Sequence, residues 1–210
     1  MEAAPSAEER RLVDALRAGD ESAFTQLVQE YGPSMLRVAR MFVSSRAVAE
    51  EVVQEAWVGV LNGIDRFEGR SSLKTWIFRI LTNTAKTRAI REGRSIPFSA
   101  LAGEGEEPGG VDADRFLGDD SRFPGHWAAP PQRWEALPER RLLAAETLDV
   151  IEREIAKLPP NQAIVVTMRD VEGFDAEDVR NALDISETNQ RVLLHRARTK
   201  LRRALEEYMQ

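Results

Sequence analysis

Residues 67–94 read FEGRSSLKTWIFRILTNTAKTRAIREGR, and this stretch decides the fold of the N-terminal half of the chain. It opens with a polar loop and then runs without proline or glycine until Gly93. Either Ser71 or Ser72 is placed to cap a helix that starts there. Within that helix, apolar residues recur at steps of three and four, namely Leu73, Trp76, Ile77, Ile80 and Leu81. The pattern predicts a loop followed by a long amphipathic helix.

Charge is distributed unevenly around this helix. The chain carries a net charge of −6, yet residues 66–94 hold eight Lys or Arg against Glu68 and Glu92, a local charge of +6. Only the tail, residues 186–210, is basic again, with six Lys or Arg against three acids. Two separate basic patches on an acidic chain indicate two contacts with one polyanion, most simply nucleic acid.

Composition excludes several classes of protein. The 210 residues and 42% hydrophobic content suffice for one large or two small domains. No apolar run approaches the roughly 20 residues that span a bilayer, and the N-terminus lacks a signal-peptide core. There is no cysteine, and His126 and His195 are the only histidines, so metal centres are not expected. We expect a soluble, cytoplasmic protein without a membrane partner, a metal or a cofactor.

Helical periodicity also precedes the basic helix. It predicts helices over 8–18, around 23–31, around 35–43 and over about 47–62, with Gly32 and Pro33 separating the second from the third. In the last of these the residues expected to face inward are Val48, Val52, Val53, Ala56, Trp57, Val60 and Leu61. With the basic helix, these segments predict a compact all-α unit of about four helices, residues 8–94.

The composition changes abruptly after this unit. Residues 95–138 contain six prolines, six glycines and no sustained periodicity, which is typical of a linker, and we assign it to residues 95–140. It also carries large aromatic side chains, Phe116, Phe123, Trp127 and Trp134. These aromatics either dock on a partner or fold back onto the linker's own domains.

The third segment, residues 141–210, again has helical patterns. An apolar helix ends near Leu158, and Pro159-Pro160 opens the next. Asp175 then caps a short helix, the turn 184–186 follows, and a basic helix runs from Glu187 to about Tyr208. This is the helix-turn-helix pattern, whose second helix enters the major groove. The apolar stripe expected along that helix is Leu194, Ala197, Leu201, Leu205 and Tyr208.

Four segments, in this order and spacing, resemble the bacterial RNA polymerase sigma factors of the extracytoplasmic-function (ECF) subgroup. They are AEEVVQEAW (49–57), FEGRSSLKTWIFRILTNTAK (67–86), LPPNQAIVVTMRDVEGF (158–174) and LLHRARTKLR (193–202). The resemblance implies a transcription initiation factor, not an enzyme. Its two all-α domains would bind the −10 and −35 promoter elements and nucleate melting by capturing a flipped non-template base. Its acidic linker would pass through the polymerase.

For the −10 element the resemblance implies the loop after Phe67 and the polar face of the basic helix. Asn83 is suited to reading a base edge, and cationic residues to holding phosphates. At the spacing of its neighbours, Trp76 fits a core residue better than a stacking platform. The complete set of −10 candidates is Phe67, Gly69, Arg70, Lys74, Trp76, Arg79, Asn83, Lys86 and Arg88.

For the −35 element the resemblance implies the start of the last helix, where Arg191 is suited to a bidentate guanine contact. The helix departs from the family pattern, because Gln190 stands where the family has a buried valine and Leu193 where it has a basic residue. Asp184 replaces the turn glycine, which requires it to adopt a left-handed backbone. The −35 candidates are Thr188, Asn189, Arg191, Val192, His195, Arg196 and Arg198.

Core RNA polymerase is the protein partner that the resemblance implies. Its largest-subunit clamp helices would meet an acidic helix face formed by Glu51, Gln54 and Glu55. The flap of its second-largest subunit is a further contact that the resemblance implies. A solvated helix face would show the same residues. An anti-sigma factor is a further partner that many members of the family have.

Two other functions fit parts of the sequence. A helix-turn-helix regulator would bind its operator tightly without polymerase and hold a ligand within residues 20–90. A polymerase-binding adaptor would need the acidic helix face and not two DNA-reading helices. The sequence shows no phosphate-binding glycine loop, metal-ligand spacing or nucleophile constellation, so an enzyme is the remotest alternative.

Overall fold

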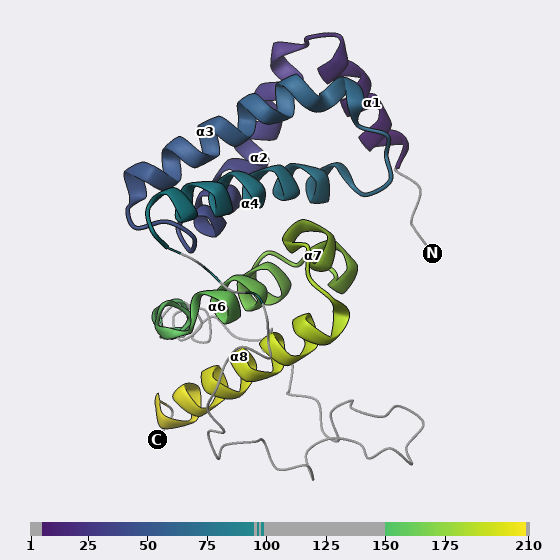
Figure 1. Cartoon of the computed structure of the whole chain (residues 1–210). Coiled ribbons are helices and arrows are strands. Elements are labelled where there is room, and N and C mark those ends of the chain that lie inside the picture. Colours follow the sequence, from purple (N-terminus) through teal and green to yellow (C-terminus); the bar gives the residue numbers. More distant parts are fainter. Residues whose placement is uncertain (1–5, 95, 97, 99–149, 209–210) are drawn as a thin grey trace, which may run out of the picture. The chain divides into compact units, whose positions relative to one another are not determined.

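The computed structural model describes residues 6–94, 96, 98 and 150–208, and within these ranges the chain forms helices and no strand (Figure 1). Almost all of the predicted linker, residues 95–140, and its four large aromatic residues therefore lie outside the described residues. Packing divides the chain into two units: residues 1–102 with 159–194, and residues 103–158 with 195–210. The predicted domain boundaries at 94 and 140 stay a prediction.

The N-terminal segment of the first unit is built from four α-helices and a short 3₁₀ turn. In chain order these are α1 (Ala7–Arg17), α2 (Glu21–Ala39), α3 (Arg46–Gly63), η1 (Ile64–Arg66) and α4 (Leu73–Arg91). Each α-helix begins at a side-chain cap, because Ser6, Asp20, Ser45 and Ser72 each accept a hydrogen bond from a backbone N–H of the first turn. The predicted cap of the basic helix is thereby resolved to Ser72.

One helix boundary was predicted wrongly. Gly32 and Pro33 do not end a helix, because α2 continues through them to Ala39. Proline inside a helix removes a backbone hydrogen bond and costs about 3 kcal/mol. Helix α2 tolerates this cost because it buries Leu27 on one side of the proline, and Met35 and Val38 on the other, all at 0% exposure.

Helices α3 and α4 run side by side and carry about half of the core of this segment (Figure 1). Ile77 and Leu81 of α4 are fully buried. The approach of the two helices is close at two glycines, since a Cβ on Gly59 would lie 3.0 Å from Ile80 and one on Gly63 would lie 3.2 Å from Trp76. Of the residues expected to face inward from α3, Val60 does so, but Leu61 is 48% exposed.

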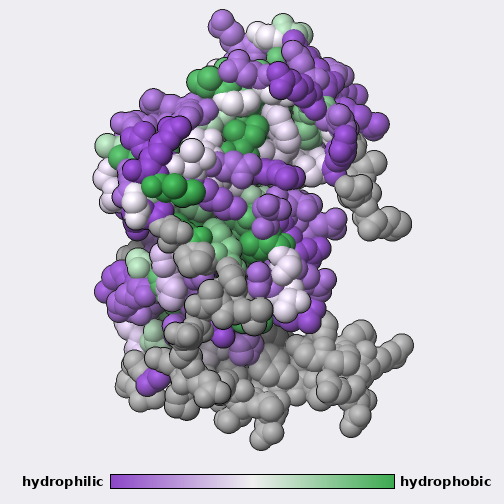
Figure 2. Space-filling model, in the orientation of Figure 1, coloured by the Kyte–Doolittle hydropathy of each residue, from purple (hydrophilic) through white to green (hydrophobic). Residues whose placement is uncertain are grey.

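Helix α1 packs on this core through Val13 and Leu16, which are 5% and 6% exposed. It contacts η1 and α2. In Figure 2, most of the visible surface around α1 and α3 is hydrophilic, and hydrophobic residues form separate patches. None of the helices in the described ranges is both long enough and apolar enough to cross a membrane.

The C-terminal segment forms the predicted helix-turn-helix. Residues 150–157 are helical, and they are followed by α6 (Pro160–Val166) with a π-helical turn η4 (Thr167–Val171), α7 (Ala176–Leu183) and α8 (Glu187–Tyr208). Asp175 caps α7 through a hydrogen bond from Asp178 N, as predicted. Asp184 lies in the left-handed region at φ 57° and ψ 56°, which confirms its role as substitute for the turn glycine.

The apolar stripe of α8 differs from the predicted one. Leu193 and Ala197 are buried at 1% and 0% exposure, whereas Tyr208 is 50% exposed. Gln190 is buried at 3%, as its place at a normally apolar position predicts. Ala197 of the predicted stripe is therefore buried and Leu194 packs against the core, whereas Tyr208 is not part of the stripe. Gln190 and Leu193 extend the buried face towards the start of the helix, because a helix face repeats every three or four residues.

Candidate nucleic-acid interface

The polar loop between η1 and α4, residues 67–72, is held at both ends. Gly69 lies in the left-handed region at φ 70°, which glycine adopts without strain. At the far end Ser72 caps α4 by accepting from Thr75 N at 3.1 Å. Phe67, a predicted −10 residue, is 6% exposed, and its ring packs 5.2 Å from that of Trp76. The Phe67 side chain thus forms part of the core under the loop.

A pocket of about 420 Å³ opens beside this loop. Three guanidinium groups lie around it, those of Arg66, Arg70 and Arg79, and Trp76 contributes a half-buried indole. Arg70 forms an ion pair with Glu68, also on the loop. Cationic groups beside an aromatic side chain are the combination that binds a base together with its phosphates. The pocket therefore has the chemistry of a nucleotide site.

Helix α4 has one face exposed to solvent, formed by residues at helical spacing. Arg79, Asn83 and Thr87 are exposed on it, and Ile90 is 69% exposed. Asn83 lies one helical turn from Arg79, so its amide is presented on the same side of the helix as the pocket arginine. Two of the predicted −10 residues, Arg79 and Asn83, are thereby brought onto one accessible face.

Two predicted lysines are engaged within the first unit. Lys74 donates to Glu172 O at 3.0 Å, and its Nζ lies 4.1 Å from the centroid of the Phe174 ring. Lys86 donates to Leu183 O, and burial lowers the pKa of Lys86 below its usual value, against the opposing charge of Asp184. Each ammonium group uses one of its three donors on a carbonyl.

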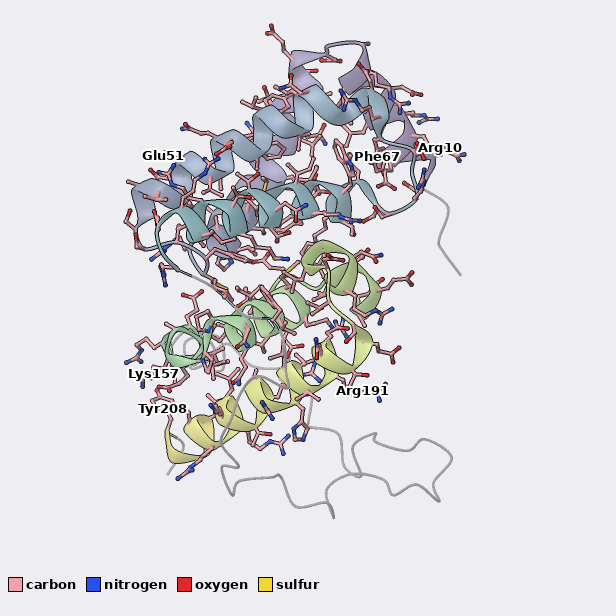
Figure 3. All side chains as sticks on the ribbon, viewed as in Figure 1. Arg10, Glu51, Phe67, Lys157, Arg191 and Tyr208 are labelled. Atoms are coloured by element: carbon pink, nitrogen blue, oxygen red, sulfur yellow. The ribbon has the colours of Figure 1, made fainter. Side chains whose placement is uncertain are left out.

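Arg88 and the acidic face of α3 are linked. Arg88 Nη2 contacts Glu51 Oε2 at 2.6 Å, and its Nε lies 3.7 Å from Glu92 Oε1. Gln54 and Glu55 are exposed on the same face of α3, and Glu51 is labelled there in Figure 3. The three predicted polymerase-contacting residues are thus accessible together.

The start of α8 presents the −35 candidates. Arg191, labelled in Figure 3, has a side chain that is 77% exposed and pairs with Glu187 at 2.7 Å, one turn earlier. Asn189 donates its backbone N–H to Ser186 Oγ at 3.2 Å, which closes the turn. Thr188, His195, Arg196 and Arg198 are exposed, while Val192 is partly buried.

Three residues near the loop were missed from the sequence. Arg66 lines the 420 Å³ pocket, and it could have been found from its place in the basic stretch. Arg17 and Glu9 of α1 bind the backbone on the two sides of the loop. No local sequence signal points to them, because their partners lie about 50 or more residues away in the chain. Among the described residues, no cluster of His, Cys, Asp and Glu could hold a metal ion.

Family models match both helical segments. Residues 27–95 match Sigma-70 region 2, and residues 148–201 match Sigma-70, region 4. The RNA polymerase sigma-H factor of Pseudomonas aeruginosa is 29% identical over 199 residues, which cover 95% of this chain and 94% of that protein. The ECF RNA polymerase sigma-E factor of Escherichia coli strain K12 is 30% identical over 190 residues, covering 89% and 88%.

Two solved structures share the fold. CnrH in complex with the cytosolic domain of CnrY aligns with a TM-score of 0.56 at 20% identity, covering 95% of this chain and 97% of that one. The sigma factor RpoE in complex with the anti-sigma factor NepR from Bartonella quintana aligns with a TM-score of 0.55 at 22% identity, covering 87% and 96%. At these identities the likeness concerns the fold, with two helical domains that match regions 2 and 4.

Proposed function

Because the chain belongs to the ECF sigma factors and directs promoter-specific transcription by binding RNA polymerase, we propose that its exposed α4 face and the adjoining pocket capture a base of the −10 element. The observation that carries this proposal is the 420 Å³ pocket with Arg66, Arg70 and Arg79 around it. Asn83 stands one turn further along the same helix. Melting requires a base to leave the stack and be held, and these residues supply phosphate contacts and a base-edge reader.

Within this site, Trp76 and Phe67 act as the apolar wall and support of the pocket. Their rings are 5.2 Å apart, and Phe67 is buried while Trp76 is half-buried. An unstacked base gains about 1–3 kcal/mol from contact with an aromatic side chain. Trp76 therefore has a role in the core and, through its accessible edge, a second role against the captured base.

The other basic −10 candidates on α4 serve the DNA backbone. Lys74, Lys86 and Arg88 are all half-buried and already hydrogen-bonded to carbonyl or carboxylate oxygens. Each is therefore a weaker phosphate ligand than Arg70 or Arg79, whose side chains are exposed. We assign the first contacts with DNA to Arg70, Arg79 and Asn83.

The second DNA site is the N-terminal half of α8. In a helix-turn-helix the start of the second helix meets base edges in the major groove. Arg191 is exposed there and can exchange its ion pair with Glu187 for a bidentate guanine contact. Buried Leu193 is excluded from that role, since it belongs to the core.

The polymerase clamp helices are the partner that we assign to α3. Glu51, Gln54 and Glu55 form an exposed acidic face, and Val58 and Leu61 continue it at 56% and 48% exposure. Exposed apolar residues next to a charged patch are typical of a protein interface. We propose further that the C-terminal domain meets the polymerase flap, and that an anti-sigma factor binds this chain, as one does in the Bartonella quintana structure.

Run-off transcription tests the base-capture proposal. Purified core polymerase is supplied with a promoter library, with and without the full chain, and the selected promoters define both elements. We expect Asn83→Ala to reduce initiation at least tenfold and Gln29→Ala, an exposed amide on α2, to leave it unchanged. Equal activity of Asn83→Ala and the unaltered chain would overturn base capture. Tight DNA binding by the chain alone, without stimulation of polymerase, would instead indicate an operator-binding regulator.

A further inference from the structure

We propose that α1 positions the polar loop of residues 67–72, called the −10 loop below, and that it does so through Arg17 and Glu9. The inference rests on the proposed function of that loop. Helix α1 lies outside residues 27–95, the part that matches Sigma-70 region 2, so this role is additional to the matched region.

The first observation is a two-point contact before the loop. Arg17 Nη2 donates to Phe67 O at 2.6 Å, and Arg17 Nε donates to Ile64 O at 3.4 Å. These carbonyls belong to the start of η1 and to the residue that follows it. One rigid guanidinium plane therefore fixes the direction in which the chain enters the loop.

The second observation is a contact after the loop. Glu9 accepts a hydrogen bond from the backbone N–H of Leu73, the first residue of α4. That N–H has no partner within its own helix, and a carboxylate is favoured at a helix N-terminus. Glu9 and Arg17 are eight residues apart, about two helical turns, so a single rigid helix holds both ends of the loop.

The third observation is a cavity between the loop and α1. A cavity of about 520 Å³ separates the loop from α1, with Asp14, Arg17 and Gly69 among its lining residues. Gly69 allows the backbone many conformations. Among the described residues, Arg17 forms an ion pair with one carboxylate, that of Asp14, at 3.8 Å. The Asp14 side chain is 77% exposed. The hydrogen bonds of Arg17 and Glu9 therefore hold the loop from the α1 side, in addition to the packing of the Phe67 side chain.

The conformation of the loop in turn determines the shape of the 420 Å³ pocket, because loop residues line it. Phe67 carries the carbonyl that Arg17 holds, and its ring supports Trp76. Figure 3 labels Phe67 at the loop and Arg10 on the neighbouring α1. Arg17 is therefore a positioning residue. It does not line the 420 Å³ pocket, but it holds the carbonyl of Phe67, which does, and the Phe67 ring packs on Trp76, which also lines the pocket.

A purely structural role for α1 makes a different prediction. Val13 and Leu16 bury α1 against the core, so loss of Arg17 could simply lower the amount of folded protein. That loss would reduce transcription equally from every promoter. Loss of positioning would instead reduce the discrimination between two bases at the same −10 position, because a less rigid pocket would accept either base.

The experiment measures this discrimination as a ratio. Open-complex formation by the full chain with core polymerase is compared on a selected promoter and on its single-base −10 variant. The variants are Arg17→Met, which keeps the apolar stem, and Arg17→Lys, which keeps the charge but has no planar fork. Arg11→Met, an exposed arginine on the same helix, is the matched control. Because each ratio is taken within one preparation, loss of folded protein cancels.

We expect Arg17→Met to lower the −10 discrimination ratio at least fivefold and Arg17→Lys to lower it less. The corresponding ratio for a single-base −35 variant should not change in either variant. Arg11→Met should leave the −10 ratio unchanged. Glu9→Ala should act in the same direction as Arg17→Met. An unchanged −10 ratio in Arg17→Met, alongside a reduced ratio in Asn83→Ala, would overturn the positioning role alone. An unchanged ratio in Asn83→Ala would show that the proposed base capture itself is wrong.

Discussion

Helices α4 and α8 both carry basic residues, but the two helices hold them in different surroundings. On α4, Lys74 and Lys86 are half-buried and bound to backbone carbonyls, and one narrow face with Arg79 and Asn83 is exposed. At the start of α8, the Arg191 side chain is 77% exposed, and its ion pair in the described part of the chain is with Glu187, one turn earlier. The proposed reading face of α4 thus depends on tertiary contacts, whereas the proposed reading face of α8 is available on the helix itself.

This difference has a consequence for substitution. A change in the core under α4 should disturb its reading face, because the face exists only while the helix is packed on several sides. A change at the start of α8 should alter DNA recognition with little effect on stability. The four predictions below test this difference: two measure stability alone, and the two on α8 measure both stability and promoter recognition.

The largest effect is expected from Leu81→Ala in α4. Leu81 is fully buried, and removing a buried leucine side chain costs about 2–5 kcal/mol through lost burial and the cavity that remains. Urea unfolding of the full chain, followed by circular dichroism, measures the loss in free energy of unfolding. Ile90→Ala on the same helix, where the side chain is 69% exposed, should change that free energy by less than about 0.5 kcal/mol. Similar losses in both variants would contradict the assignment of the buried face.

Arg191→Ala should have the next largest effect, on recognition and not on folding. A bidentate contact discriminates between bases by about 1–3 kcal/mol, so the preference for the selected −35 base should fall by a corresponding factor. The free energy of unfolding should hardly change, since the exposed pair with Glu187 contributes little. Transcription from matched and mismatched −35 promoters measures the preference.

Lys200→Ala is the control for this variant. Lys200 is exposed further along α8 and is suited to a phosphate contact. Its removal should weaken binding to both promoters equally. If Lys200→Ala and Arg191→Ala reduced the −35 preference alike, Arg191 would not be the base-reading residue.

Gln190→Met should stabilise the protein. Gln190 is 3% exposed, and its Nε2 has no hydrogen-bond partner among the described residues. A buried donor without a partner costs about 1–3 kcal/mol, and methionine has a similar shape without that donor. We expect the free energy of unfolding to rise by about 1 kcal/mol while the −35 preference stays the same. A loss of stability would indicate that the amide is satisfied in solution.

The smallest effect is expected from Asp178→Asn, and it depends on pH. Burial raises the pKa of Asp178 above its usual value of 3.8, although a hydrogen bond from Thr75 acts in the opposite direction. The native state therefore binds the proton more tightly than the unfolded state, so ionisation costs stability as the pH rises above 3.8. Asparagine keeps the acceptor and cannot ionise.

The urea midpoint of Asp178→Asn should therefore exceed that of the unaltered chain at pH 7. The gain should shrink as the pH is lowered towards 3.8, where Asp178 is increasingly protonated in both states. A gain that is independent of pH would show that ionisation of Asp178 is not its cause.

Much of the fold followed from local patterns in the sequence. The helix from Leu73, its cap at Ser72, the cap at Asp175 and the left-handed Asp184 all depend on residues within about four positions of each other. Part of the candidate site could be predicted in the same way, because the charge and spacing of residues 66–94 indicate the basic helix. The prediction at Pro33 failed, because a local rule about proline was outweighed by burial along α2.

By itself, the sequence determined the all-α class, the order of the helices, the helix-turn-helix and the two basic patches. These properties arise from backbone capping, turn chemistry and helical periodicity, which act over a few neighbouring residues. Only the tertiary structure decided where the buried face of a helix departs from its apolar pattern. It exposed Leu61, buried Leu193 and Phe67, and brought Arg17 to the carbonyls before the −10 loop. The physical reason is that burial and long-range hydrogen bonds depend on partners that lie far away in the chain.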